Sequence, residues 1–196
     1  MWFEILMKRY QILGVLGAVV AYPFIAVSIL LTPWFNFYDN ALSDLGNMAR
    51  NTPVAYLFNT GLFISGILVA SFAYLVSLKN RSWKYLSWSI ILILTGLDLA
   101  LIGLFPEDAG RIHGVVSVIF FLMMIVVMFV YGLCSLIFKK YVTGVFALVS
   151  SIAEAMVWMI QWSWKGVAIQ ETLTSLISTA WLIAVSLGHE NMLGKS

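Results

Sequence analysis

The chain has 196 residues, of which 62% are hydrophobic and only 10% are charged, and its formal net charge is +2. A soluble domain has about 45–50% apolar and roughly 25% charged residues, so this composition excludes an ordinary soluble fold. No block of Lys and Arg occurs, so nucleic acid is not an expected partner. The single cysteine, Cys134, excludes an intrachain disulfide framework.

Six apolar segments are each long enough to cross a bilayer, whose hydrocarbon core of about 30 Å needs roughly 20 residues of helix. Each segment must be helical, because backbone groups that face lipid have no water to bind. We therefore predict an all-α bundle of six transmembrane helices that forms one domain over residues 1–196. The predicted spans are 11–32, 53–77, 84–105, 112–137, 142–163 and 169–188.

The distribution of Lys and Arg over the connecting segments predicts the orientation of the bundle. If the N-terminus is cytoplasmic, eight of these residues fall inside and three fall outside. The positive-inside rule then places both termini in the cytoplasm. We therefore expect a multi-pass protein of the cell membrane. The inner residues are Lys8, Arg9, Lys79, Arg81, Lys84, Lys139, Lys140 and Lys195, and the outer ones are Arg50, Arg111 and Lys165.

The first span and the polar segment after it carry clear local signals. Pro23 lies near the middle of the span, where the loss of one backbone hydrogen bond predicts a kink. The segment 39–47 holds two carboxylates, two amides and a hydroxyl in nine residues. We expect a short interfacial helix here, capped at its start by Asp39 or Asn40 and ended by Gly46.

Small residues on the second span have a spacing that favours close helix packing. Gly61 and Ser65 are four residues apart, and so are Gly66 and Ala70, so each pair lies on one face of the helix. We interpret both pairs as packing contacts. The same faces would also permit a homodimer.

The later spans carry polar side chains that would be costly on a surface facing lipid. In each case the residues are three or four positions apart, so they share one side of their helix. These polar faces are Thr95 with Asp98, His113 with Ser117, Glu154 with Trp158 and Gln161, and Glu171 with Ser175 and Ser178.

Asp98 and Glu154 are predicted to lie at nearly the same depth, about 12 Å and about 13 Å below the outer end of the membrane, from a rise of about 1.5 Å per residue. An ionised acid at such a depth is costly, so both should face the bundle interior or a wet cavity. No basic residue lies at that level, and we expect at least one acid to be protonated or to share a proton. A structural polar network and a polar cavity open to the outer leaflet both explain the pair.

The cavity interpretation predicts a site for a lipid headgroup or another amphiphile, with membrane lipids as partners. A second interpretation is an intramembrane lipid hydrolase or transferase that uses His113 with nearby acids. A third is a proton-coupled transporter with Asp98 and Glu154 as proton carriers. The residues predicted to bind the ligand are Asp44, Asn59, Asp98, His113, Glu154 and Gln161.

Catalysis or metal binding on the outer side would have to use a single histidine. His113 with Ser43 and Asp44 could imitate a nucleophilic triad, but no nucleophile elbow accompanies the serine. His113, Asp44 and Glu107 could ligate a divalent metal, although no HxxxH, HExxH or CxxC motif occurs. We predict no cofactor, and the metal-dependent enzyme stays open as an alternative.

Two motifs lie at the outer ends of the spans. The first is NALSDLG at 40–46, followed by Pro53 and by LFNTG at 57–61, and the second is GLFPE at 103–107 with IHG at 112–114. Both resemble an uncharacterised prokaryotic family of six-span proteins, catalogued as a domain of unknown function. The first motif is also similar to the eukaryotic Frag, DRAM and Sfk proteins, six-span proteins tied to lipid remodelling, membrane lipid organisation and autophagy. The resemblance implies no particular reaction, but it implies a shared core of the fold or site at Ser43, Asp44, Gly46, Pro53, Asn59, Pro106 and His113.

Overall fold

The computed structural model describes residues 2–192, which form helices and loops without any strand in the described part. Six helical segments are long and apolar enough to cross a membrane, so the predicted six-span all-α bundle is confirmed. The first span combines α1 and α2. The elements are α1 (Trp2–Val19), α2 (Ala21–Leu30), η1 (Leu42–Gly46), α3 (Met48–Asn51), α4 (Val54–Lys79), α5 (Trp83–Leu104), η2 (Glu107–Ala109), α6 (Arg111–Ile137), α7 (Tyr141–Met159) and α8 (Ala168–Met192), where η marks a short 3₁₀ helix.

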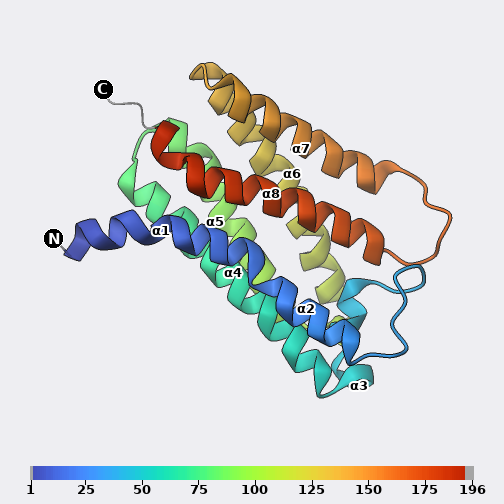
Figure 1. Ribbon diagram of the computed structural model, residues 1–196. Coiled ribbons are helices and arrows are strands. Elements are labelled where there is room, and N and C mark those ends of the chain that lie inside the picture. The colour runs from blue at the N-terminus through green and yellow to red at the C-terminus, as the bar shows by residue number, and fades with distance from the viewer. Residues whose placement is uncertain (1, 193–196) are drawn as a thin grey trace.

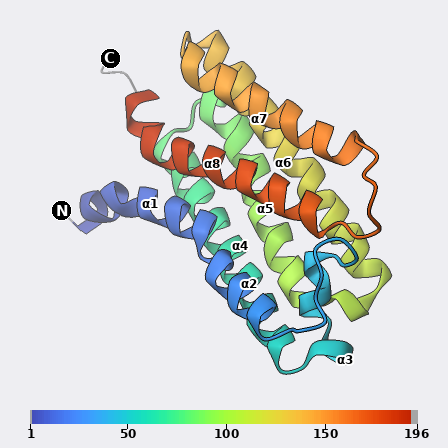
Figure 2. The same ribbon diagram turned by 45° about the vertical axis from the view of Figure 1, so that its right-hand side comes forward.

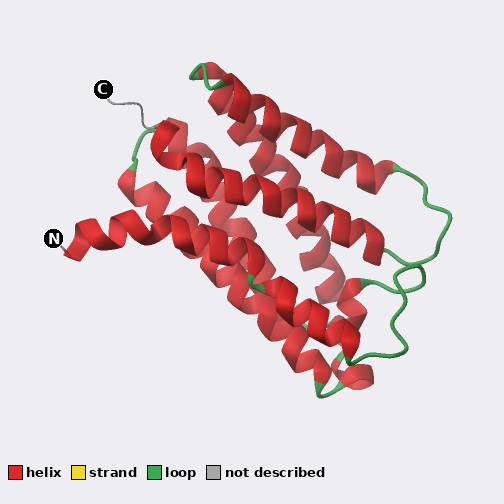
Figure 3. Cartoon of the chain, viewed as in Figure 1, coloured by secondary structure: helices red, strands yellow, loops and turns green. Residues whose placement is uncertain are grey.

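The six spans form a closed ring (Figure 1). Each span contacts the next along the chain, and α8 closes the ring by packing against α1. Figure 2 shows η1, α3 and the loop before α8 together at one end of the bundle, which we call the η1 end. The longest loops also lie there (Figure 3). Because the number of spans is even, the first and last described residues lie together, opposite the η1 end (Figure 1). The cytoplasmic placement of the termini stays a prediction. Lys195, which contributes to it, lies outside the described residues.

The first span is broken near its middle, as Pro23 predicts. The proline ring has no N–H for the carbonyl four residues earlier, and it also clashes with that carbonyl. Hydroxyls from two neighbouring spans bind carbonyls close to the break. Ser65 Oγ donates to the Gly17 carbonyl over 2.6 Å. Thr179 Oγ1 donates to the Ala18 carbonyl over 3.2 Å, so side chains of two neighbouring spans bind the turn before the break.

Glycines allow α4 to approach its neighbours closely. A Cβ added to Gly96 of α5 would lie 2.6 Å from the backbone nitrogen of Ala70, and one added to Gly66 would lie 2.4 Å from the α5 backbone. Gly61 faces the Phe24 side chain of α2 in the same way. The small residues of the second span therefore serve packing inside the chain, as predicted, and a homodimer would have to form on another surface.

The interfacial segment differs from its prediction in how it begins. The N-cap of η1 is Ala41, whose backbone N–H donates to the Asp44 carboxylate over 3.1 Å. The prediction that Asp39 or Asn40 caps this helix was wrong, because the capping acid lies inside the helix and reaches back. The helix ends at Gly46, as predicted.

The fifth span ends earlier than predicted. α7 stops at Met159, and the indole N–H of Trp162 donates to the Val157 carbonyl over 2.9 Å. This hydrogen bond satisfies one of the carbonyls that remain open in the last turn of a helix. Gln161 therefore lies beyond the helix and is exposed, so its predicted place on one stripe with Glu154 was wrong.

We expect Gly96→Ala to lower the unfolding temperature of the detergent-purified protein. The added methyl group would have to displace the α4 backbone, which typically costs about 1–3 kcal/mol. Gly114→Ala is the matched control, because no atom outside its own helical turn lies within 4 Å of an added Cβ. There the substitution should leave stability unchanged or raise it slightly. Equal thermal melts of the two variants, followed by circular dichroism, would contradict the close packing of α4 and α5.

Candidate ligand-binding cavity

A cavity lies between the helices beneath η1. Residues of α1, α2, η1, α4, α5, α6 and α8 line it, and α7 lies outside it. The space open to the centres of water-sized molecules is about 130 Å³. One water needs roughly 10–15 Å³ by this measure, so the cavity has room for part of a larger molecule.

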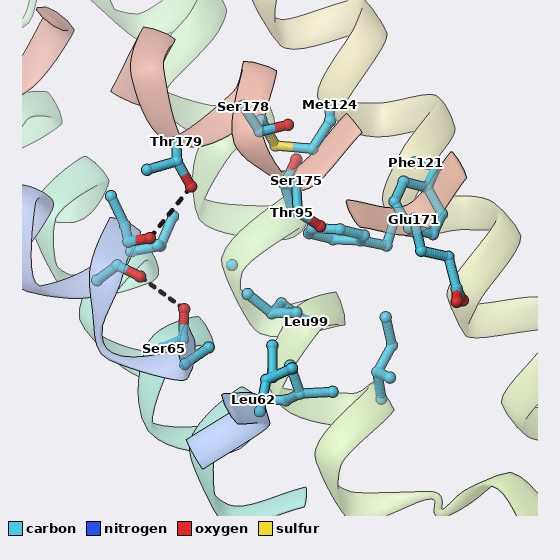
Figure 4. Close-up of a pocket in the computed structure, with 18 of the residues that line it drawn as sticks. Leu62, Ser65, Thr95, Leu99, Phe121, Met124, Glu171, Ser175, Ser178 and Thr179 are labelled. Atoms are coloured by element: carbon cyan, nitrogen blue, oxygen red, sulfur yellow. Dashed lines mark hydrogen bonds between the residues drawn. The ribbon is translucent and has the colours of Figure 1, made fainter. Parts of the chain in front are cut away.

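The cavity wall is mainly apolar, with polar groups concentrated on α8. Figure 4 shows Leu62, Leu99 and Phe121 around the space, with Ser175 of α8 among them. Glu171 lies on the far side of this space from Ser65 and Thr179 (Figure 4). An apolar wall with a few convergent polar groups is typical of small-molecule sites.

The predicted polar face of α8 forms one side of the cavity. Glu171, Ser175 and Ser178 all line it, which confirms that the three residues share one side of the helix. Sequence reasoning did not place Glu171 among the ligand-binding residues. The signal that could have found it was this spacing of four and then three residues, which carries a carboxyl group onto a face of hydroxyls.

Glu171 also holds the segment that covers the cavity. Its Oε2 atom accepts a hydrogen bond from the backbone N–H of Leu42 over 2.5 Å, which binds η1 to the first turn of α8. Leu42 and Leu45 are buried against Phe58 of α4. Between them, Ser43 lines the cavity. The polar segment after the first span thus forms the cover of the cavity, and Ser43 is its polar lining residue.

Asp44 and Asn59 fix the shape of this cover. Asp44 accepts a hydrogen bond from the side chain of Asn40 over 2.8 Å, in addition to its bond to the start of η1. Asn59 of α4 donates to the Gly46 carbonyl over 2.9 Å. The backbone N–H groups of residues 167 and 168 donate to the Asn40 carbonyl over 3.1 and 2.9 Å. These contacts join three parts of the η1 end that are far apart in sequence.

The loop between α5 and α6 supplies a further pair of ties. Glu107 accepts a hydrogen bond from the Asn47 side chain. Asp108 Oδ1 accepts from the backbone N–H of Met48 over 2.7 Å. Both acids therefore bind donors just beyond η1, and the acidic residues of this loop serve the closure of the η1 end.

His113 is buried at the start of α6, with both ring nitrogens engaged. Nδ1 lies 2.7 Å from the Phe105 carbonyl oxygen, and Nε2 lies 3.3 Å from the Ser117 hydroxyl. A carbonyl oxygen can only accept, so Nδ1 carries a proton and donates it to Phe105. The imidazole thus joins the end of α5 to the first turns of α6. Catalysis with Ser43 would require it to exchange these partners.

Asp98 and Glu154 are both buried, as the predicted inward orientation requires. Glu154 of α7 accepts a hydrogen bond from the Ser178 hydroxyl, and its Oε2 atom has no partner. The Oδ2 atom of Asp98 is also buried without a partner. Neither acid lines the cavity, although Ser178 does, and so does Leu99 beside Asp98. The two acids therefore lie behind the cavity wall.

The structure distributes the predicted ligand-binding residues over three places. None of them lines the cavity, whose polar groups come from other positions. Among the residues described, no group of three or more His, Cys, Asp or Glu side chains is close enough to hold a metal ion, so the weak metal candidates His113, Asp44 and Glu107 do not converge. Asp44, Asn59 and His113 hold the η1 end together, Asp98 and Glu154 lie behind the wall, and Gln161 is exposed.

These features define an integral membrane protein with six spans around an internal cavity. The chain belongs to the family described as protein of unknown function (DUF998), whose model matches residues 15–188. No curated protein and no solved structure matches the chain. The predicted membership of an uncharacterised family is thereby confirmed, and the similarity to the Frag, DRAM and Sfk proteins stays a prediction.

We expect Glu171→Ala to loosen the cover of the cavity. The Leu42 N–H would lose its acceptor, and an unsatisfied buried donor costs about 1–3 kcal/mol. Since roughly 1.4 kcal/mol corresponds to a factor of ten, amide exchange in η1 should rise about tenfold. Hydrogen–deuterium exchange of peptides that cover residues 41–46 measures this change.

Asp39→Ala is the control for this experiment. Asp39 lies in the same polar segment, is exposed, and accepts a hydrogen bond from the side chain of nearby Asn36. Its loss should leave exchange in η1 unchanged. An equal rise in both variants, or no rise in Glu171→Ala, would show that Glu171 does not hold the cover.

Proposed function

We propose that this protein binds an amphiphilic molecule of the cell membrane in the cavity between its helices. One observation carries the proposal: an apolar wall and the carboxyl and hydroxyl groups of α8 face the same space inside a membrane-spanning bundle. An alkyl chain would pack against Leu62, Leu99 and Phe121. The polar head would lie near Glu171 and Ser175, because these groups replace part of its hydration.

The closed η1 end supports membrane lipid as the source of this ligand. Leu42 and Leu45 are buried under the interlocked loops, so a molecule that enters from water would have to displace them. A lipid instead reaches the helices from the side. The resemblance to six-span proteins tied to lipid remodelling supports the same class of ligand.

A substitution that fills the cavity tests the proposal. Ser175→Phe would place a bulky ring in the space, so the amount of co-purified amphiphile should fall about tenfold, a loss of roughly 1.4 kcal/mol in binding. Native mass spectrometry of the protein, released gently from detergent, measures the bound mass. Ala180→Phe is the matched control, because Ala180 is an exposed residue of the same helix. Unchanged bound mass in a Ser175→Phe protein with a normal melting temperature would contradict binding in this cavity.

The position of Glu154 favours a second candidate function, proton-coupled transport. Its side chain is fully buried, and one carboxyl oxygen accepts from Ser178, which lines the cavity. The other oxygen has no hydrogen-bond partner. Intramembrane acids next to a cavity are typical of proton relays, so this carboxyl group could exchange a proton as a ligand moves.

Glu154→Gln separates transport from binding. Glutamine keeps the size of the side chain and an acceptor for Ser178, but it cannot carry a proton. We expect transfer of the co-purified amphiphile across vesicles under a pH gradient to fall at least about tenfold, while its binding by native mass spectrometry is kept. Asp39→Asn, at an exposed position of the polar segment, should leave transfer unchanged. Transfer that is insensitive to the pH gradient, or unaffected in Glu154→Gln, would exclude this candidate.

A further inference from the structure

The charge of the cavity lining limits the polar head that can enter it. Within the described chain, the lining contains one carboxyl group, that of Glu171, and no Lys, Arg or His side chain. Arg50, which belongs to the η1 end, instead stacks over Trp34, with its Cζ atom 3.6 Å from the centre of the ring. A buried anion without a counter-charge is very costly, so the lining disfavours a phosphate or carboxylate head.

Several lining hydroxyls already donate their only proton. Thr95 Oγ1 donates to the Ile91 carbonyl over 2.8 Å, and Ser65 and Thr179 donate to carbonyls of α1 over 2.6 and 3.2 Å. Because the Thr179 proton is used in this way, the Tyr22 hydroxyl 2.7 Å away donates to Thr179. A hydroxyl has one proton and two lone pairs, so these groups can offer the cavity only acceptor oxygens.

The hydroxyls near the buried acid and the imidazole follow the same pattern. Ser178 donates to the Glu154 carboxyl group. The Ser117 hydroxyl lies 3.3 Å from Nε2 of His113, so this lining hydroxyl is also engaged by a group outside the cavity. Groups that do not line the cavity therefore engage these two lining serines, and Ser178 keeps only acceptor capacity for a ligand.

The remaining polar groups add little donor capacity. Glu171 uses Oε2 to accept from the backbone of η1, and its Oε1 atom is a further acceptor when the carboxyl group is ionised, as it would be beside an ammonium head. Ser43 and Ser175 are the lining serines whose protons take no part in the hydrogen bonds described above. The polar side of the cavity is therefore rich in acceptors and poor in donors.

We infer that the cavity selects an amphiphile whose head donates hydrogen bonds, a long-chain amine or amino alcohol, over a fatty acid or an alkyl phosphate. The inference rests on the proposed function, because it concerns the same cavity. An ammonium or hydroxyl head supplies the protons that the lining lacks, and an ammonium group also complements Glu171. A carboxylate or phosphate head would meet oxygen lone pairs on most sides.

A series of probes with one alkyl chain tests this selectivity. Dodecylamine, dodecanol, dodecanoate and dodecyl phosphate are offered in equal amounts to the protein in phosphatidylcholine nanodiscs, and native mass spectrometry reports the occupancy of each. We expect the amine and the alcohol to exceed the two anions at least about tenfold, and Ser175→Phe to abolish binding of both. Equal or tighter binding of either anion would overturn the inference. If no probe binds, the inference also fails, whereas the proposed function is judged separately by the co-purified amphiphile.

A conservative substitution tests the role of Glu171 without removing the cover. Glu171→Gln keeps an oxygen for the Leu42 N–H but presents an amide NH₂ group in place of the second oxygen. The preference for dodecylamine over dodecanol should fall about tenfold, while dodecanol still binds. Asp39→Asn, in the exposed part of the polar segment, should leave the preference unchanged. An unchanged preference in Glu171→Gln would overturn the assignment of Glu171 as the partner of the amine.

Discussion

A helix inside a bilayer must satisfy its own backbone hydrogen bonds, and the first span cannot do so at Pro23. Ser65 and Thr179 donate to the Gly17 and Ala18 carbonyls, in the turn before the break. Both hydroxyls also line the cavity. The hydrogen bonds beside the break thus help to set the polarity of the cavity, because a hydroxyl that donates to a carbonyl can offer a ligand only its lone pairs.

The polar residues of the η1 end serve a different purpose. Asp44 binds the backbone at the start of η1. Asn59, Glu107 and Asp108 bind backbone or amide groups around η1, and each of these three bonds joins segments that a loop alone would leave loosely placed. Their concentration in the sequence looks like a site. In the structure it is a closure, which keeps Leu42 and Leu45 buried over the cavity.

The fold could be predicted because its determinants are local. Apolar length fixes the six spans, and Pro23 marks the break in the first one. The early end of α7 could not be predicted in the same way, because it depends on the contact between the Trp162 indole and a carbonyl of the last turn. For the same reason, the prediction that Gln161 shares a helix face with Glu154 was wrong, because the helix ends at Met159.

The cavity could be predicted only in part, because an acidic residue that stands out in an apolar span does not always line the cavity. Asp98 and Glu154 stand out as acids in apolar spans, yet both lie behind the wall. Glu171 stands out less, because it begins its span and resembles a surface residue. Whether a residue lines the cavity depends on which side of its helix faces the interior of the ring, and packing against several neighbouring helices sets that side.

Glu171 links the cover and the cavity through its two oxygens. Oε2 accepts from the Leu42 N–H, so a donor head bound at Oε1 would add a second hydrogen bond to the same carboxyl group without removing the first. In the proposed complex, ligand and cover therefore do not compete. A ligand that binds only the closed form stabilises that form, and a closed cover in turn strengthens ligand binding by the same factor. The cover then acts as part of the site, since its stability and the affinity for the amphiphile depend on one side chain.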